Sequence, residues 1–140
     1  MLDQDDRIML LRYDENGGFW ATPGGSLEPG ETHPQAAARE LREELGIHDA
    51  ALGPHLATRV KDHPVAGQPV RQAERYYLAR VHTGTVTPAS ATQTDNIREW
   101  RWWTLPEITA TRQVIYPAGL TALLQAVIAS GPPAVPVTLS

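Results

Sequence analysis

Three glutamates in the first third of the chain have a spacing that would bring their carboxylates together. They are Glu40, Glu43 and Glu44. Residues three and four positions apart are neighbours on a helix, so these side chains would share one face and repel one another by a few tenths of a kcal/mol per pair. A divalent cation would relieve this repulsion, and Mg²⁺ takes carboxylate ligands while keeping waters that phosphate oxygens can displace. The spacing therefore indicates a metal site that handles phosphate groups.

A helix must position these carboxylates, and the surrounding residues carry the signals for one. Thr32 can cap the first turn, and Gln35 three positions later completes a capping box. Gly46 suits the left-handed residue that follows many helices. Apolar residues at four-residue spacing would form the buried stripe: Ala37, Leu41 and Leu45. The sequence thus predicts a helix that begins after Thr32 and ends before Gly46.

The segment before this helix predicts a β-hairpin and a glycine-rich turn. Residues 8–12 form an apolar run that indicates a strand, residues 14–18 a polar turn, and residues 19–22 a returning strand. A Pro-Gly-Gly sequence at 23–25 then breaks the strand, and its glycines let the backbone approach a ligand closely. Little strand-forming sequence precedes Ile8, so we expect the first strand to be truncated unless the native chain begins upstream.

After the helix, the sequence predicts further strands and one more helix. Branched and aromatic residues favour strands, whereas two prolines and a glycine within thirteen residues favour a long loop. The predicted elements are strands at 55–60, 74–82 and 97–104, loops at 61–73 and 88–96, and a helix at 120–129. This order indicates an α+β domain in which helices cover a mixed sheet.

Composition narrows the class of protein. With 140 residues the chain fits one domain, which we place at residues 1–131, followed by a proline-rich tail at 132–140. A net charge of −4 argues against a protein that binds duplex nucleic acid nonspecifically. There is no cysteine, so disulfides and thiolate metal sites are excluded. No leader and no apolar run of about 18 residues is present, and we expect a soluble, cytoplasmic protein without membrane contact.

The residues around the glutamates also form a longer pattern. The pattern is a glycine, five residues, a glutamate, seven residues, then Arg-Glu, an aliphatic residue, one residue, Glu-Glu, one residue, Gly and an aliphatic residue. Its positions are filled by Gly25, Glu31, Arg39, Glu40, Leu41, Glu43, Glu44, Gly46 and Ile47. A random window would match all nine about once in 10⁹ trials. On this box, the chain resembles a Nudix hydrolase.

The resemblance extends beyond the box and carries expectations about fold and activity. Trp20 with the following Pro-Gly, and Arg101-Trp102 with the later Glu107-Ile108, look like the family's flanking pattern. The resemblance implies a Nudix-type α/β/α sandwich with a mixed β-sheet flanked by helices. It also implies Mg²⁺- or Mn²⁺-dependent hydrolysis of a diphosphate linkage in a nucleoside diphosphate linked to another moiety, such as a nucleotide, a nucleotide sugar or ADP-ribose.

Roles for the box residues follow from the same resemblance. It implies that Glu40, Glu43 and Glu44 are the metal ligands and that the backbone carbonyl of Gly24 joins them. An arginine among carboxylates can hold one of them through a bidentate pair and orient metal ligands from behind. We therefore expect Arg39 to pair with Glu31.

The general base is harder to assign, because members of the family differ. Some use a glutamate of the helix and others an acidic residue from a distant loop. Glu43 is the first choice, and Asp95 and Glu99 are the alternatives from the segment that precedes the tryptophan-rich strand. Asn96 occupies the position where many relatives carry a further acidic residue, so either Asp95 replaces that residue or its role is absent.

The sequence offers few candidates for substrate contacts. Trp20 could stack on a nucleobase, although aromatic residues in strands are more often core residues or cross-strand pairs. Arg59 and Lys61 flank the predicted long loop and could reach substrate phosphates, or could form a solvated rim. The identity of the diphosphate substrate therefore stays open.

Two alternatives compete with a Nudix hydrolase. A Nudix domain can act without catalysis, as a nucleotide sensor or a protein-binding module, but such domains usually lose a box carboxylate and this chain has them all. An acidic helix can also be a solvated surface without metal. Finally, a C-terminal segment that packs on a neighbouring molecule would indicate a homodimer.

Overall fold

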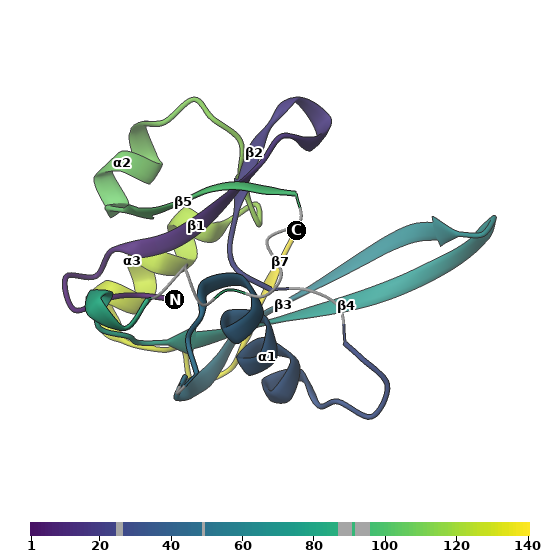
Figure 1. Ribbon diagram of the computed structural model, residues 1–140, viewed down its shortest axis with the longest axis horizontal. Coiled ribbons are helices and arrows are strands. Elements are labelled where there is room, and N and C mark those ends of the chain that lie inside the picture. Colours follow the sequence, from purple (N-terminus) through teal and green to yellow (C-terminus); the bar gives the residue numbers. More distant parts are fainter. Residues whose placement is uncertain (25–26, 49, 87–90, 92–95) are drawn as a thin grey trace.

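The computed structural model of the chain describes residues 1–24, 27–48, 50–86, 91 and 96–140, and Figure 1 shows their arrangement. The first sheet has the order β5-β1-β2-β6 and contains β1 (Ile8–Tyr13), β2 (Phe19–Ala21), β5 (Ile97–Trp103) and β6 (Ile115–Tyr116). The second has the order β4-β3-β7 and contains β3 (Leu52–Val65), β4 (Gln68–Ala79) and β7 (Val137–Leu139). In each sheet one pair is parallel, β2 with β6 and β3 with β7, so both sheets are mixed.

The helices are α1 (His33–Leu45), α2 (Leu105–Ala110) and α3 (Leu120–Ser130), with short 3₁₀ turns at Glu15–Gly17 and Thr83–Thr85. They cover both faces of β1. Ile8 and Leu10 belong to a core with residues of α2 and α3, whereas Met9 and Leu11 belong to a core with Leu41 of α1. Successive strand residues point to opposite faces, which explains the continuous apolar run in this strand. The predicted α/β/α sandwich is confirmed, with its mixed strands divided between two sheets.

Helix α1 begins and ends where its local signals place it. The Thr32 side chain accepts a hydrogen bond from the Gln35 backbone, the Gln35 side chain accepts one from the Thr32 backbone, and Gly46 is left-handed with a φ of 67°. Leu41 and Leu45 are buried as predicted, but Ala36 is the buried alanine and Ala37 is only partly covered. Helix α1 contacts β4 of the second sheet, and both alanines line the cavity beside its first turns.

The prediction of a long loop at residues 61–73 is wrong. These residues continue β3 and β4 as one antiparallel hairpin that projects from the body of the molecule (Figure 1). Its turn consists of Ala66 and Gly67, whose φ angles of 51° and 78° match a two-residue type I′ turn. Pro64 and Pro69 face each other one step from the turn, in a pair that makes no ladder hydrogen bonds, so their missing N–H groups cost nothing.

Helix α2 and strands β6 and β7 were not predicted from the sequence. The signal for α2 was present, because Thr104 and Glu107 form a second capping box. Strands β6 and β7 are too short to carry a pattern. None of the helices in the described segments is long and apolar enough to span a membrane.

The C-terminal segment packs on its own chain. Strand β7 runs parallel to β3, with Val137 opposite Ala57 and Leu139 opposite Arg59. The boundary after residue 131 and the homodimer both stay predictions. The predicted turn at 88–96 lies mostly outside the described residues.

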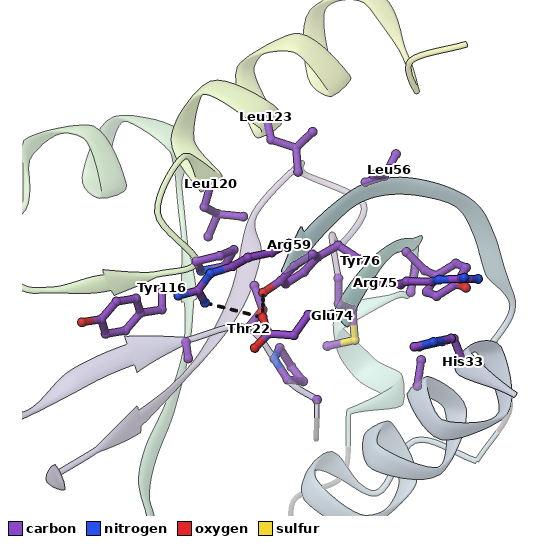
Figure 2. Close-up of a pocket in the computed structure, with 18 of the residues that line it drawn as sticks. Thr22, His33, Leu56, Arg59, Glu74, Arg75, Tyr76, Tyr116, Leu120 and Leu123 are labelled. Carbon is purple, nitrogen blue, oxygen red and sulfur yellow. Dashed lines mark hydrogen bonds and ion pairs between the residues drawn. The ribbon is translucent and has the colours of Figure 1, made fainter. Parts of the chain in front are cut away.

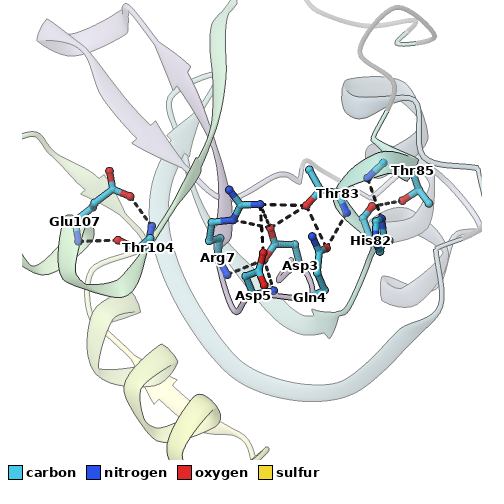
Figure 3. Close-up of polar contacts among 10 residues, drawn as sticks. Asp3, Gln4, Asp5, Arg7, His82, Thr83, Thr85, Thr104 and Glu107 are labelled. Atoms are coloured by element: carbon cyan, nitrogen blue, oxygen red, sulfur yellow. Dashed lines mark hydrogen bonds and ion pairs between the residues drawn. The ribbon is translucent and has the colours of Figure 1, made fainter.

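A buried carboxylate anchors the residues that precede β1 (Figure 3). Asp3 is 1% exposed and accepts hydrogen bonds from the backbone N–H groups of Asp5 and Arg7, from the Arg7 guanidinium and from the Thr83 hydroxyl, at 2.8–3.0 Å. Nearby, Leu2 bridges to both Ile8 and Arg80. These contacts tie the residues before Ile8 to β1 and to the residue that follows β4, and the truncation of the first strand stays a prediction.

Candidate active site

Arg39 lies at the centre of the acidic face of α1. Its Nε and Nη2 atoms donate to the two oxygens of Glu31 at 2.8 and 3.0 Å, which is the expected bidentate pair. Its Nη1 atom donates to Glu40 Oε1 at 2.9 Å and to Glu43 Oε2 at 3.0 Å. The hydrogen bonds from Arg39 lower the pKa of Glu31 below its usual value. One guanidinium therefore holds three carboxylates of the box in a fixed arrangement.

Glu44 is buried one turn further along the helix. Only 8% of its surface is exposed, and its Oε1 accepts a hydrogen bond from the Gly24 backbone N–H at 3.0 Å. Its Oε2 accepts a hydrogen bond from the Tyr13 hydroxyl at 3.3 Å. Burial raises the pKa of Glu44 to about 7, the charge of Glu40 adds to the shift, and the hydrogen bond from Gly24 opposes it.

The donor set of this face suits a hard divalent cation. Glu40 and Glu43 accept from the same nitrogen of Arg39, so a positive charge already lies between them. Burial also raises the pKa of Glu40, against the opposing effect of Arg39. Carboxylate oxygens that are crowded and partly desolvated are ligands for Mg²⁺ or Mn²⁺, and the charge of such an ion would offset both the burial and the repulsion.

The carboxylates of the acidic face are not arranged as a complete set of metal ligands in the part of the chain that the structure describes. Within the described segments, no three acidic or histidine side chains converge as the ligands of one ion would. The contacts above give the reason, since Arg39 holds Glu40 and Glu43 while Gly24 and Tyr13 hold Glu44. The metal-ligand roles of the three glutamates and of the Gly24 carbonyl thus stay predictions. Gly25 of the box lies outside the described residues.

The alternatives for the general base are separated by the fold. Glu99 lies opposite Arg12 in the β1–β5 pair, and these two side chains form an ion pair at 3.7 Å. Arg12 and Tyr13 are adjacent in β1 and therefore point to opposite faces of the sheet, and Tyr13 is the one that reaches Glu44. Glu99, 49% exposed, is thus on the wrong face to serve α1. Asp95 lies outside the described residues, and Glu43 remains the first choice.

A cavity of about 850 Å³ opens beside the first turns of α1 (Figure 2). Gly24 lines it and also binds Glu44, so the cavity adjoins the acidic face. The inward face of the β3–β4 hairpin contributes polar side chains: Arg59, Lys61, Gln72, Glu74 and Tyr76. Apolar and aromatic side chains line the opposite wall, among them Phe19, Tyr116 and Leu120.

Glu74 in the cavity is contacted from two sides, by Tyr76 and by Arg59. Tyr76 donates its hydroxyl hydrogen to Glu74 Oε2 at 2.6 Å, and Arg59 Nη1 approaches the same oxygen at 3.5 Å. Figure 2 shows the three side chains meeting in the middle of the cavity. Arg59 and Lys61 thus belong to the cavity, as the substrate-contact interpretation requires.

Trp20 is a core residue and not a cavity residue. It is 3% exposed, its ring packs edge-to-face on Trp103 with the centroids 5.1 Å apart, and its Nε1 donates to Gln113 Oε1 at 2.6 Å. Other aromatic side chains, among them Phe19 and Tyr116, line the cavity instead. Glu74 and Tyr76 were not assigned to the site from the sequence, because the strand was predicted to begin only at residue 74, after a loop at 61–73. Period-two alternation through residues 72, 74 and 76 was the signal that could have found them.

Comparisons with known proteins agree with the box pattern. A family model described as the NUDIX domain matches residues 1–124. Among curated proteins, a CTP pyrophosphohydrolase of Escherichia coli is 37% identical over 65 residues, which are 44% of this chain and 47% of that protein. An 8-oxo-(d)GTP phosphatase of Mycolicibacterium smegmatis is 36% identical over 106 residues, which are 76% of this chain and 28% of that protein. This chain thus spans less than half the length of these two relatives.

Among solved structures, the dihydroneopterin triphosphate pyrophosphohydrolase of E. coli matches with a TM-score of 0.69 and 23% identity. The match covers 92% of this chain and 91% of that chain. At this identity the likeness shows a common fold.

Proposed function

Because this chain belongs to the Nudix family, we propose that it hydrolyses a diphosphate linkage in a nucleoside diphosphate joined to another moiety. Nudix hydrolases act on small-molecule diphosphate substrates and generally use divalent metal ions. In the proposed reaction, water attacks a phosphorus atom of the linkage, and the bond from that phosphorus to the bridging oxygen breaks.

The arrangement around Arg39 carries this proposal. It gathers Glu40 and Glu43 on one nitrogen, next to the buried Glu44, at the edge of a cavity large enough for a nucleotide. A noncatalytic Nudix domain would have no need to keep every box carboxylate in place. We therefore assign Mg²⁺ or Mn²⁺ to Glu40, Glu43 and Glu44, with the Gly24 carbonyl as a further ligand.

The metal ion and the side chains around it would have separate roles in the reaction. When bound, the divalent ion neutralises charge on the diphosphate oxygens and acts as a Lewis acid toward water. Arg39 keeps Glu40 and Glu43 oriented, and Glu31 keeps Arg39 oriented in turn. Glu43 takes the proton that the attacking water loses. Phosphoryl transfer depends mainly on positioning and charge neutralisation, and a metal ion held on a rigid helix would supply both.

The cavity suits the nucleoside part of the substrate. Tyr116 and Phe19 offer aromatic faces, and Arg59 with Glu74 offers a hydrogen-bond donor beside an acceptor. A heterocyclic base has a stacking face and an edge that carries both donors and acceptors, so it can use both walls. The two relatives are named as a CTP pyrophosphohydrolase and an 8-oxo-(d)GTP phosphatase, so nucleoside triphosphates are the first substrates to test.

A substrate screen tests the proposal. Nucleoside triphosphates, 8-oxo-dGTP, nucleotide sugars, ADP-ribose, dinucleoside polyphosphates and diphosphate cofactors would be incubated with Mg²⁺ or Mn²⁺, and phosphate release would be measured with and without added phosphatase. We expect metal-dependent turnover of at least one class. A protein that binds nucleotides but turns none over with either metal would support the noncatalytic alternative and overturn the proposal.

A further inference from the structure

An aromatic residue at the end of β1 reaches across to the acidic face of α1. Tyr13 donates its hydroxyl hydrogen to Glu44 Oε2 at 3.3 Å, over a sequence separation of 31 residues. Its ring stacks on Phe19, its cross-strand partner in β2, with the centroids 5.2 Å apart and the planes 21° from parallel. The ring is therefore held by the sheet while the hydroxyl contacts the helix.

The pairing of β1 with β5 favours this position of the ring. The register shifts between Arg12 and Tyr13, so that Ile97 and not Arg98 lies opposite Tyr13. Such irregularities commonly re-aim side chains near functional sites. Here the shift gives the Tyr13 ring an apolar neighbour, and Arg98 forms an ion pair with Asp14 at 3.1 Å instead of lying beside Glu44.

Two donors from the first sheet and its following loop fix the buried carboxylate. Gly24 holds Oε1 and Tyr13 holds Oε2, so neither oxygen can rotate away without losing a hydrogen bond. An ionised carboxylate has about four lone-pair sites, and each oxygen keeps one for a further partner. The contacts therefore orient Glu44 without blocking it.

We propose that Tyr13 is a positioning residue for Glu44, whose hydroxyl sets the carboxylate in the orientation that a divalent ion requires. The proposal rests on the metal-ligand role given to Glu44 under the proposed function. Groups that hydrogen-bond to metal ligands fix their orientation, and removing such a group typically weakens metal affinity or activity by about 10- to 100-fold. None of the motifs in the sequence includes this tyrosine.

The test separates the hydroxyl from the ring. Tyr13→Phe keeps the stack on Phe19 and removes only the donor to Glu44. Mn²⁺ binding to the metal-free protein would be measured by titration calorimetry, together with the thermal melt. We expect Mn²⁺ affinity to fall about tenfold while the metal-free melting temperature stays close to that of the wild type. Tyr76→Phe is the matched control, because its hydroxyl bonds to Glu74 and not to the acidic face, and its Mn²⁺ affinity should be unchanged.

The outcomes distinguish this proposal from the proposed function. If Glu44→Gln abolishes Mn²⁺ binding while Tyr13→Phe binds as tightly as the wild type, the positioning role is wrong and the metal site stands. If the wild type binds no Mn²⁺ and Glu44→Gln changes nothing, both proposals fall. Equal weakening in Tyr13→Phe and Tyr76→Phe would also overturn the positioning role, since it would show a general effect of losing a partly buried hydroxyl.

Discussion

Arg39 and Glu31 form a bidentate ion pair between residues eight positions apart, with N···O distances of 2.8 and 3.0 Å. Glu31 lies before α1, and its Oε1 also accepts a hydrogen bond from the Glu28 backbone at 2.8 Å. The loop that leads into the helix is thereby tied to the guanidinium that orients Glu40 and Glu43. A change at Arg39 should consequently affect the acidic face more than the fold.

We expect Arg39→Lys to lower kcat roughly 10- to 100-fold on the best substrate. Lysine keeps the charge but lacks the planar fork, so it cannot hold Glu31 through two bonds while also reaching Glu43. Steady-state kinetics with saturating Mn²⁺ would measure the effect. Arg42→Lys, on the exposed side of the same helix, is the control and should keep wild-type activity. Full activity in Arg39→Lys would contradict the role given to the pair.

Glu43→Gln should lower turnover at least about a hundredfold, or about 2.7 kcal/mol in the barrier. The amide can neither accept the proton of the attacking water nor carry the charge that a metal ligand needs. Circular dichroism would confirm that the variant is folded. Glu99→Gln, on the other face of the first sheet, should retain full activity. The reverse result, with Glu99→Gln inactive and Glu43→Gln active, would assign the general base to Glu99 of β5.

Divalent metal should stabilise the folded protein. A ligand that binds only the folded state adds about 2.7 kcal/mol at a free concentration a hundred times its Kd. Thermal melts with Mg²⁺ or Mn²⁺ should therefore shift upward and return to the starting value when EDTA is added. Glu44→Gln should remove most of the shift. An upward shift of equal size in this variant would place the ion elsewhere.

The carboxylate of Asp3 should make the stability of the protein depend on pH. Burial by itself would raise its pKa, but the hydrogen bonds from Arg7, Asp5 and Thr83 outweigh burial and lower it. The folded pKa is below the unfolded value of about 3.9, so the charged form stabilises the fold above that pH. This contribution is lost as pH falls through the folded pKa.

Asp3→Asn should thus lower the free energy of unfolding by about 1–3 kcal/mol at pH 7, because the amide turns a donor toward groups that are themselves donors. Urea unfolding at pH 7 and at pH 3 would measure it, and the difference from the wild type should be smaller at pH 3. Asp5→Asn serves as the control, since its side chain is mostly exposed. An equal loss at both pH values would mean that the charge of Asp3 is not the cause.

Local signals explain what the sequence could predict. Thr32, Gln35 and Gly46 act within one or two turns of α1, so the helix and the spacing of its glutamates could be inferred without knowing any neighbour. The hairpin could not be inferred in this way. Proline disfavours a strand, and Pro64 and Pro69 are harmless only once the turn at Ala66 has set which pairs exchange hydrogen bonds.

For the same reason, the sequence could not predict the parts of the site that depend on contacts between residues far apart in the chain. Tyr13 falls between the predicted strand at 8–12 and the predicted turn at 14–18, and its partner Glu44 becomes its neighbour only when α1 packs on β1. For Trp20 the sequence favoured the core and left contact with a ligand open, and the choice depends on Trp103 from a strand far along the chain. Sequence spacing identified the acidic helix, whereas tertiary packing decides which groups brace it.

The cavity gives a last prediction, which concerns binding and not chemistry. Glu74 accepts from Tyr76 and Arg59, so Glu74→Gln removes the charge that holds the guanidinium in place. If the cavity binds the nucleoside, whose atoms do not react, the variant should raise KM several-fold and leave kcat nearly unchanged, since it loses binding shared by ground state and transition state. Asp6→Asn is the control, because Asp6 forms an ion pair with Arg80 and neither residue lines the cavity. A fall in kcat with KM unchanged would instead place Glu74 next to the reacting phosphorus.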